Sequence, residues 1–166
     1  YGFRLSKSLG QNFLTARNIL EEIVDAAEIE SGVIEVGPGF GVLTSELAQN
    51  SDKVVTIEID ERLIDVLDYT LAEYDNVKII NEDILKLDLK KVIDDEFKGE
   101  KVSIAANLPY YITTPIITKL LEEKLPIKNI VVMVQKEVAE RMSAKPSTKD
   151  YGAITVLCQY YTEPSI

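Results

Sequence analysis

Short apolar, often β-branched runs alternate with segments of helical periodicity along this 166-residue chain, and this alternation constrains the fold more than any other feature. Strands separated by helices of about ten residues are typical of a parallel sheet covered by helices. We therefore expect an α/β fold with a mostly parallel sheet and helices on both faces. Length and an apolar content of 46% fit one globular unit, residues 1–166, and no internal repeat or linker divides it.

The expected elements can be placed by residue number. Strands are predicted at 33–37, 54–58, 77–81, 101–106 and 129–134. Helices are predicted at 15–27, 40–49, 61–74, 87–96, 113–123 and 135–142. The segment 152–161 has both strand propensity and an i, i+3 apolar pattern, and we favour a helix there.

Composition limits the chemistry that the chain can perform. It contains no histidine, and Cys158 is its only cysteine. Imidazole catalysis, an internal disulfide and a thiolate metal cluster are therefore excluded, and we predict no metal site. Carboxylates, amides, hydroxyls and backbone groups remain, and Cys158 is expected in the core.

The net charge of −10 by itself argues against a phosphate-rich partner, because nucleic-acid binding normally needs a basic face. Two stretches differ from the rest. The first twenty residues contain Arg4, Lys7 and Arg17 and no acidic residue. Residues 136–149 contain Lys136, Arg141, Lys145 and Lys149. Such charges most often only solvate a surface. The chain has no apolar run long enough to span a membrane and no apolar leader at its N-terminus, so a cytoplasmic protein without membrane contact is expected.

Two turns predict a nucleoside cofactor. Gly37, Gly39 and Gly41 follow the first strand in VIEVGPGFG (33–41) and let backbone approach a ligand closely. Glu58 ends the second strand, where a carboxylate accepts hydrogen bonds from ribose hydroxyls. NAD remains a rival at this point, although the spacing G-P-G-F-G departs from the G-x-G-x-x-G dinucleotide fingerprint.

Asp83 and Ile84 follow the third strand in NEDIL (81–85). The carboxylate can accept from an adenine amino group while Ile84 lies against the ring. Asp is also common as a helix cap or a solvated acid in such loops, and the two interpretations have about equal weight.

The stretch AANLPYYITT (105–114) places an amide, a proline and two aromatic rings at the end of the fourth strand. A tight turn explains them in part. The Asn107 side-chain oxygen and the Leu108 carbonyl can also accept both hydrogens of an adenine amine and so make its nitrogen more nucleophilic. Pro109 would fix the backbone, and Tyr110 would offer a ring for a flipped base to stack on, worth about 1–3 kcal/mol.

The methyl donor for such a nitrogen would be a sulfonium, and catalysis would consist mainly of positioning. No general base is needed, which suits a chain without histidine. Tyr111, Phe40 and Phe13 are interpreted as packing residues of the scaffold.

Six motifs occur in the order SLGQNFL (8–14), VIEVGPGFGVLT (33–44), TIEID (56–60), NEDIL (81–85), NLPYYITTPII (107–117) and VQKEVAERM (134–142). In this order they resemble the ribosomal RNA adenine dimethyltransferases, in particular the KsgA family that acts on small-subunit RNA. The resemblance implies S-adenosylmethionine as cofactor in a Rossmann-like class I methyltransferase domain. It further implies a cofactor-binding set made of Asn12, Leu14, Gly37, Gly39, Glu58, Ile59, Asp83, Ile84 and Asn107.

By this resemblance Asn107, Leu108, Pro109 and Tyr110 form the catalytic loop. The family transfers two methyls to N6 of each of two adjacent adenosines near the 3′ end of small-subunit RNA, so ribosomal RNA or an immature small subunit is the implied partner. Three alternatives stay open. They are a large-subunit enzyme of the erythromycin-resistance type, a ribosome-assembly or transcription factor of the same fold, and an NAD-dependent oxidoreductase, which lacks an evident proton-transfer residue.

Members of the family continue beyond the position of Thr162 with two more strands and a small helical domain. We therefore expect an incomplete methyltransferase domain that lacks its last strands, with an uncovered sheet edge. Unpaired edge groups invite weak self-association or reduced stability.

Overall fold

The computed structural model describes residues 17–109 and 111–166. The strands are β1 (Gly32–Val36), β2 (Lys53–Glu58), β3 (Val77–Asn81), β4 (Val102–Asn107) and β5 (Ile127–Met133). The helices are α1 (Arg17–Ala27), α2 (Val42–Gln49), α3 (Ile64–Thr70), α4 (Leu89–Phe97), α5 (Thr113–Glu122), α6 (Lys136–Met142) and α7 (Ala153–Tyr161). All five predicted strands are confirmed, whereas the predicted helix start at Thr15 lies outside the described residues.

Several predicted boundaries differ from the structure by two or more residues. The helix expected at 87–96 begins at Leu89, because the Asp88 side chain accepts from the Lys91 N–H and caps the helix there. The helix expected at 40–49 begins at Val42, because Gly41 before it adopts a left-handed backbone with φ of 81°. The helix expected at 61–74 is a 3-10 turn, Glu61–Leu63, followed by α3, which ends at Thr70. Strand β5 begins at Ile127, two residues earlier than predicted, because Ile127 pairs with Val102 of β4.

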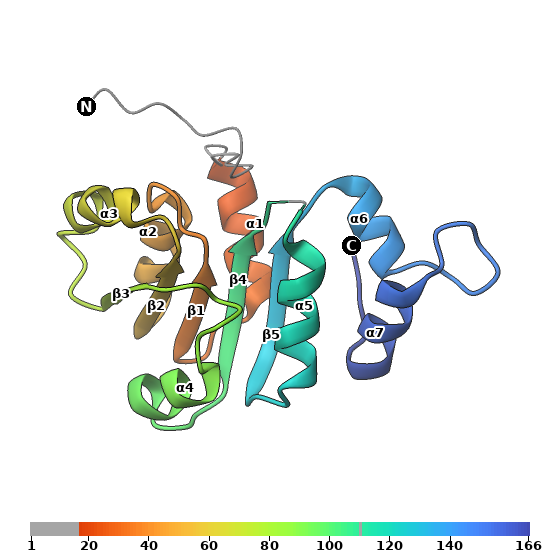
Figure 1. Ribbon diagram of the computed structural model, residues 1–166. Helices are drawn as coiled ribbons and strands as arrows, with labels where there is room; N and C mark the ends of the chain where they lie inside the picture. Colours follow the sequence, from red (N-terminus) through yellow and green to blue (C-terminus); the bar gives the residue numbers. More distant parts are fainter. Residues whose placement is uncertain (1–16, 110) are drawn as a thin grey trace.

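The five strands form one parallel sheet in the order β3-β2-β1-β4-β5. The chain moves outward from β1 to β3 and then returns to place β4 against the other side of β1 (Figure 1). The order therefore reverses between β1 and β4. In open α/β sheets, ligands bind beyond the carboxyl ends of the strands at such a reversal.

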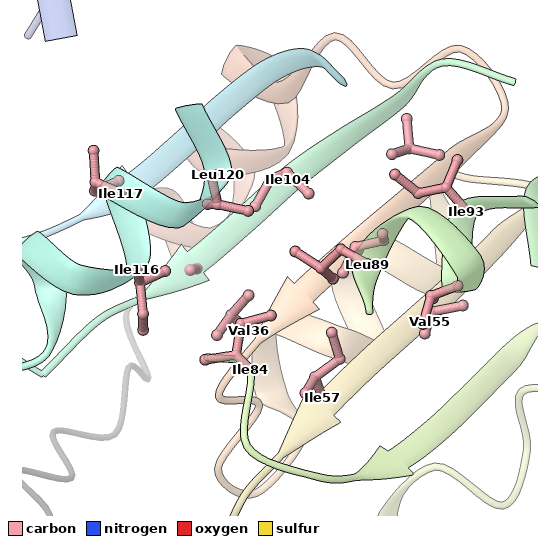
Figure 2. Close-up of a cluster of buried hydrophobic side chains, with 14 of the residues drawn as sticks. Val36, Val55, Ile57, Ile84, Leu89, Ile93, Ile104, Ile116, Ile117 and Leu120 are labelled. Atoms are coloured by element: carbon pink, nitrogen blue, oxygen red, sulfur yellow. The ribbon is translucent and has the colours of Figure 1, made fainter. Parts of the chain in front are cut away.

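Helices cover both faces of the sheet, as predicted. Helices α4 and α5 lie on one face and α1 and α2 on the other (Figure 1). Figure 2 shows α4 and α5 presenting Leu89, Ile93 and Ile116 to side chains of β1, β2 and β4. Burial of each such side chain stabilises the fold by roughly 1.5–3 kcal/mol.

The ambiguous segment 152–161 is helical, as we favoured. Thr155 and Cys158 are buried on one side of α7, while Val156 and Tyr160 are exposed on the other. Cys158 packs into the core cluster that includes residues of α5, which confirms it as a core residue. The local sequence of 153–161 is compatible with a strand or a helix. The helix forms because it buries one face of the segment against the core.

Strand β5 is an edge of this sheet. All seven of its residues are half-buried, and no strand in ranges 17–109 and 111–166 pairs with its outer side. In these same ranges, no helix is long and apolar enough to cross a membrane.

Gly32 in β1 is required by its neighbour Phe97 at the end of α4. A Cβ at position 32 would stand 2.4 Å from two carbons of the Phe97 ring. Because the ring is buried, Gly32→Ala should lower the free energy of unfolding by about 1–3 kcal/mol in urea denaturation. In a Phe97→Leu background the same substitution should cost less, and an equal cost in both backgrounds would contradict this explanation.

Candidate functional site

A cavity of about 450 Å³ lies at the carboxyl ends of the strands, at the reversal between β1 and β4. Its volume is that of typical small-molecule sites. It brings together the ends of β1, β2 and β4 and the loops after β3 and β5. Of the described residues that we predicted to bind or catalyse, all line it: Gly37, Gly39, Glu58, Ile59, Asp83, Ile84, Asn107, Leu108 and Pro109. Asn12, Leu14 and Tyr110 lie outside the described residues.

The glycine turn forms one wall of this cavity. Gly37, Gly39 and Gly41 have φ values of 72°, 59° and 81°, which side chains other than glycine adopt only with strain. The Gly37 N–H donates to the Ile57 carbonyl at 2.9 Å and ties the turn to β2. A Cβ at Gly37 would meet no atom within 4 Å, so this position borders open space. The turn therefore offers bare backbone to a ligand.

Glu58 ends β2 and is buried, with 5% of the residue exposed. Its Oε1 accepts from the Asp60 N–H at 2.8 Å. Burial raises the pKa of Glu58, whereas hydrogen bonds from the N–H groups of Asp60 and Gly39 favour the charged form. The site thus holds an oriented carboxylate against the cavity, which suits an acceptor for ligand hydroxyls.

Glu35 of β1 pairs with Thr56, two residues before Glu58 in β2, and it was not predicted as a functional residue. Its Oε2 accepts from the Thr44 hydroxyl at 2.5 Å, and burial raises its pKa to about 7. Its Oε1 and the Thr56 hydroxyl have no hydrogen-bond partner among the described residues, although Thr56 is near enough to lower the pKa. Glu35 is a buried carboxyl at the cavity wall.

Asp83 stabilises the turn that follows β3. Its Oδ1 accepts from the Leu85 N–H at 2.9 Å, which is a turn-stabilising bond, and its Oδ2 lies 3.8 Å from the Lys86 ammonium. The residue also lines the cavity, as does the buried Ile84. The turn interaction leaves carboxylate lone pairs for a ligand.

The segment Asn107–Pro109 is anchored on both sides. Asn107 ends β4 opposite Met133, and the Leu108 N–H donates to the Met133 carbonyl at 3.1 Å. The Pro109 carbonyl accepts from the Thr113 hydroxyl at 3.0 Å and from the Ile112 N–H at 3.2 Å. The amide therefore projects from a backbone that is fixed by β5 on one side and by the start of α5 on the other.

The packing role predicted for Tyr111 was wrong. Its side chain is 48% exposed and lines the cavity. Phe40 packs partly against α3, as predicted, and also borders the cavity. Sequence reasoning missed Asp60 and Gln135 as lining residues. Gln135 follows β5 directly, so the rule that identified the other strand ends could have found it.

The comparisons with known proteins agree with this geometry. Residues 2–166 match the sequence model of a family described as ribosomal RNA adenine dimethylase. The chain belongs to the ribosomal RNA adenine dimethylase family. Proteins named ribosomal RNA small subunit methyltransferase A are similar to this chain along nearly its whole length. The protein of Alkaliphilus oremlandii is 56% identical over 168 residues, covering 100% of this chain and 58% of its own length. The protein of Bacillus mycoides is 58% identical over 166 residues. The match covers 98% of this chain and 57% of that protein.

Solved structures show the same fold. A dimethyladenosine transferase from Plasmodium falciparum is 34% identical with a TM-score of 0.76, over 89% of this chain and 52% of that protein. The 23S rRNA methyltransferase ErmE is 31% identical with a TM-score of 0.70. The match covers 80% of this chain and 51% of that protein. The predicted Rossmann-like methyltransferase fold is therefore confirmed. The chain spans about 58% of the length of the curated relatives it matches.

Proposed function

We propose that this chain is the cofactor-binding and catalytic core of an adenine N6-dimethyltransferase that modifies two adjacent adenosines near the 3′ end of small-subunit ribosomal RNA. The observation that supports this most is the cavity at the β1–β4 reversal, which joins the glycine turn and Glu58 to Asn107, Leu108 and Pro109. The names of the 56–58% identical relatives favour the small-subunit substrate. Such RNA would place the protein in the cytoplasm.

S-adenosylmethionine fits the residues present. Glu58 would accept from its ribose hydroxyls, and Gly37 and Gly39 would lie against its amino-acid part. Asp83 would accept from its adenine amine, and Ile59 and Ile84 would border the nucleoside. Asn12 and Leu14, outside the described residues, would complete the set. When bound, this cofactor supplies an electrophilic methyl group.

Asn107 and Leu108 would prepare the target nitrogen. Their oxygens would accept the two amine hydrogens of adenine and draw its lone pair out of the ring, while Tyr110 would stack on the flipped base. Pro109 limits backbone motion between these groups. The chain would thus contribute by orienting the nucleophile in a fixed geometry. Such orientation can lower the activation free energy of the transfer by a large amount.

The large-subunit alternative rests on ErmE, which is less similar, at 31% identity. Transfer assays on immature small subunits and on protein-free 23S RNA distinguish the two substrates. The assembly-factor alternative predicts docking on ribosomal particles without any need for the Asn107 amide.

Calorimetry of this chain tests the cofactor. S-adenosylmethionine should bind at a single site, and NAD at the same concentration should release no binding heat. Binding of NAD alone would contradict the proposal, and binding of neither would show that residues 1–166 do not form the site by themselves.

Gly37→Ala should weaken cofactor binding while leaving the chain folded. Because a Cβ there meets no protein atom, the cost should be only the left-handed φ of 72°, about 1–2 kcal/mol of stability. The added methyl would occupy space used by the cofactor, so affinity should fall at least about tenfold, equivalent to 1.4 kcal/mol. Gly99→Ala is the matched control, since Gly99 has a φ of 74° away from the cavity. Equal affinities in the two variants would contradict the assignment.

The outer edge of β5 supports a further part of the proposal, weak self-association of this chain. Backbone groups on an edge strand can pair with a second copy. Sedimentation velocity over a concentration series should show reversible dimers at high concentration, and a monomer at every concentration would contradict this.

A further inference from the structure

Arg62 holds the Asp60 carboxylate with three hydrogen bonds at the rim of the cavity. Its Nε donates to Oδ1 at 2.8 Å, its Nη2 to Oδ2 at 2.5 Å and its backbone N–H to Oδ1 at 3.1 Å. The Asp60 side chain is only 6% exposed, while that of Arg62 is 57% exposed. Forked pairs of this kind are strong and fix orientation. A largely exposed arginine therefore fixes a buried acid in the cavity wall.

Asp60 acts on Glu58 in two opposing ways. Its backbone N–H donates to Glu58 Oε1 at 2.8 Å, which orients that carboxylate and favours its charged form. Its own negative charge is close enough to raise the pKa of Glu58, in addition to the larger effect of burial. The guanidinium of Arg62 offsets this charge and also holds the loop that carries the N–H.

We propose that Arg62 is a positioning residue for the cofactor, which acts through Asp60 to keep the Glu58 carboxylate charged and aimed at the ribose hydroxyls. The inference rests on the proposed function, because it takes Glu58 as the ribose ligand. Arg62 itself need not touch the cofactor. Its contribution would appear in how cofactor affinity depends on pH.

Other charged groups at or near the cavity stay constant in the test. Glu35 lies on β1 and senses the Glu58 charge, and Glu82, Asp83 and Lys86 belong to the loop after β3. Since none of them changes in an Arg62 variant, a difference between the wild-type and variant pH profiles isolates the arginine.

The dissociation constant of S-adenosylmethionine should be measured between pH 6 and pH 9 for wild type, Arg62→Gln and Arg62→Lys. A protonated Glu58 accepts fewer hydrogen bonds, so affinity should fall as the pH is lowered through its pKa. In Arg62→Gln that fall should begin at higher pH than in wild type, so the severalfold loss of affinity relative to wild type should be largest at the acid end of the range and smallest at pH 9. Arg62→Lys should restore most of the affinity.

Two further variants guard the interpretation. Lys90→Gln removes an exposed positive charge, paired with Asp94 at 2.9 Å on α4, and its profile should match wild type. Asp60→Asn removes the charge that Arg62 offsets, so adding Arg62→Gln to it should not shift the profile further. That comparison holds even if Arg62→Gln alone folds poorly.

Three results would overturn the inference: no change in Arg62→Gln, a loss of equal size at every pH, or a further pH shift in the double variant. The first two would leave Arg62 with no role or with only a structural one. If wild type itself binds no S-adenosylmethionine, residues 1–166 do not form the cofactor site by themselves, and the inference fails together with that part of the proposed function. If wild type binds and the profiles coincide, the inference fails alone.

Discussion

Asn107→Ala, in a full-length protein that carries this sequence, should reduce methyl transfer to ribosomal RNA about a hundred- to a thousandfold, the range found when one preorganised hydrogen-bonding group is removed. The amide stands at the end of β4, where the Leu108 N–H is bonded to Met133, so the backbone should stay in place when the side chain is lost. The amine would then lose one of the two acceptors that activate it. Single-turnover assays at saturating cofactor measure this step directly.

The matched control removes an asparagine amide that does not line the cavity. Asn50→Ala deletes an exposed side chain that donates to the Glu46 carbonyl at 2.8 Å at the end of α2, and its transfer rate should equal that of wild type. Cofactor affinity should fall much less than the rate in Asn107→Ala. Full transfer by Asn107→Ala would contradict the proposed chemistry, and a variant without transfer that still met every cellular need would favour the assembly-factor alternative.

The second large effect concerns stability and the buried carboxyl of Glu35. Burial raises its pKa in the folded chain from an ordinary value of 4.5 to about 7. The folded state therefore binds the proton more tightly than the unfolded state between these values, and the free energy of unfolding falls as the pH rises through this window. At about 1.4 kcal/mol per pKa unit, the total loss is about 3 kcal/mol, complete above pH 7.

Urea denaturation between pH 5.5 and pH 8 tests this, and the range avoids precipitation near the isoelectric point of about 4.6. Wild type should lose about 2 kcal/mol across the range. Glu35→Gln keeps an acceptor for the Thr44 hydroxyl and cannot ionise, so its unfolding free energy should change much less and exceed that of wild type at pH 8. Parallel curves for the two proteins would show that Glu35 does not carry the buried proton.

Most of the fold and the core of the site could be predicted from the sequence, because each depends on local pattern. Strand β3 was predicted at its observed bounds, since the β-branched residues Val77, Ile79 and Ile80 favour a short strand there. The glycine turn follows β1 and Asn107 ends β4, and parallel strands bring their carboxyl ends to one edge. Because β1 and β4 are neighbours in the sheet, the glycine turn and Asn107 lie at the same cavity.

What could not be predicted depends on tertiary contacts. Tyr111 follows Tyr110 in the sequence, and nothing local says that the Tyr111 ring faces the cavity. Glu35 appears as one polar residue in a buried strand, and its effect depends on Thr44 and Thr56 from two other elements. Asp60 has the pattern of an ordinary helix cap, so its link to Glu58 becomes visible only in three dimensions.

The central claim is that one cavity holds S-adenosylmethionine with its methyl group directed at the oxygens that follow β4. A crystal structure of this chain with S-adenosylhomocysteine tests it most directly. The ribose hydroxyls should lie within hydrogen-bond distance of Glu58, and the ligand sulfur should face the Asn107 side chain. A ligand bound outside this cavity, or one whose sulfur points away from Asn107, would contradict it.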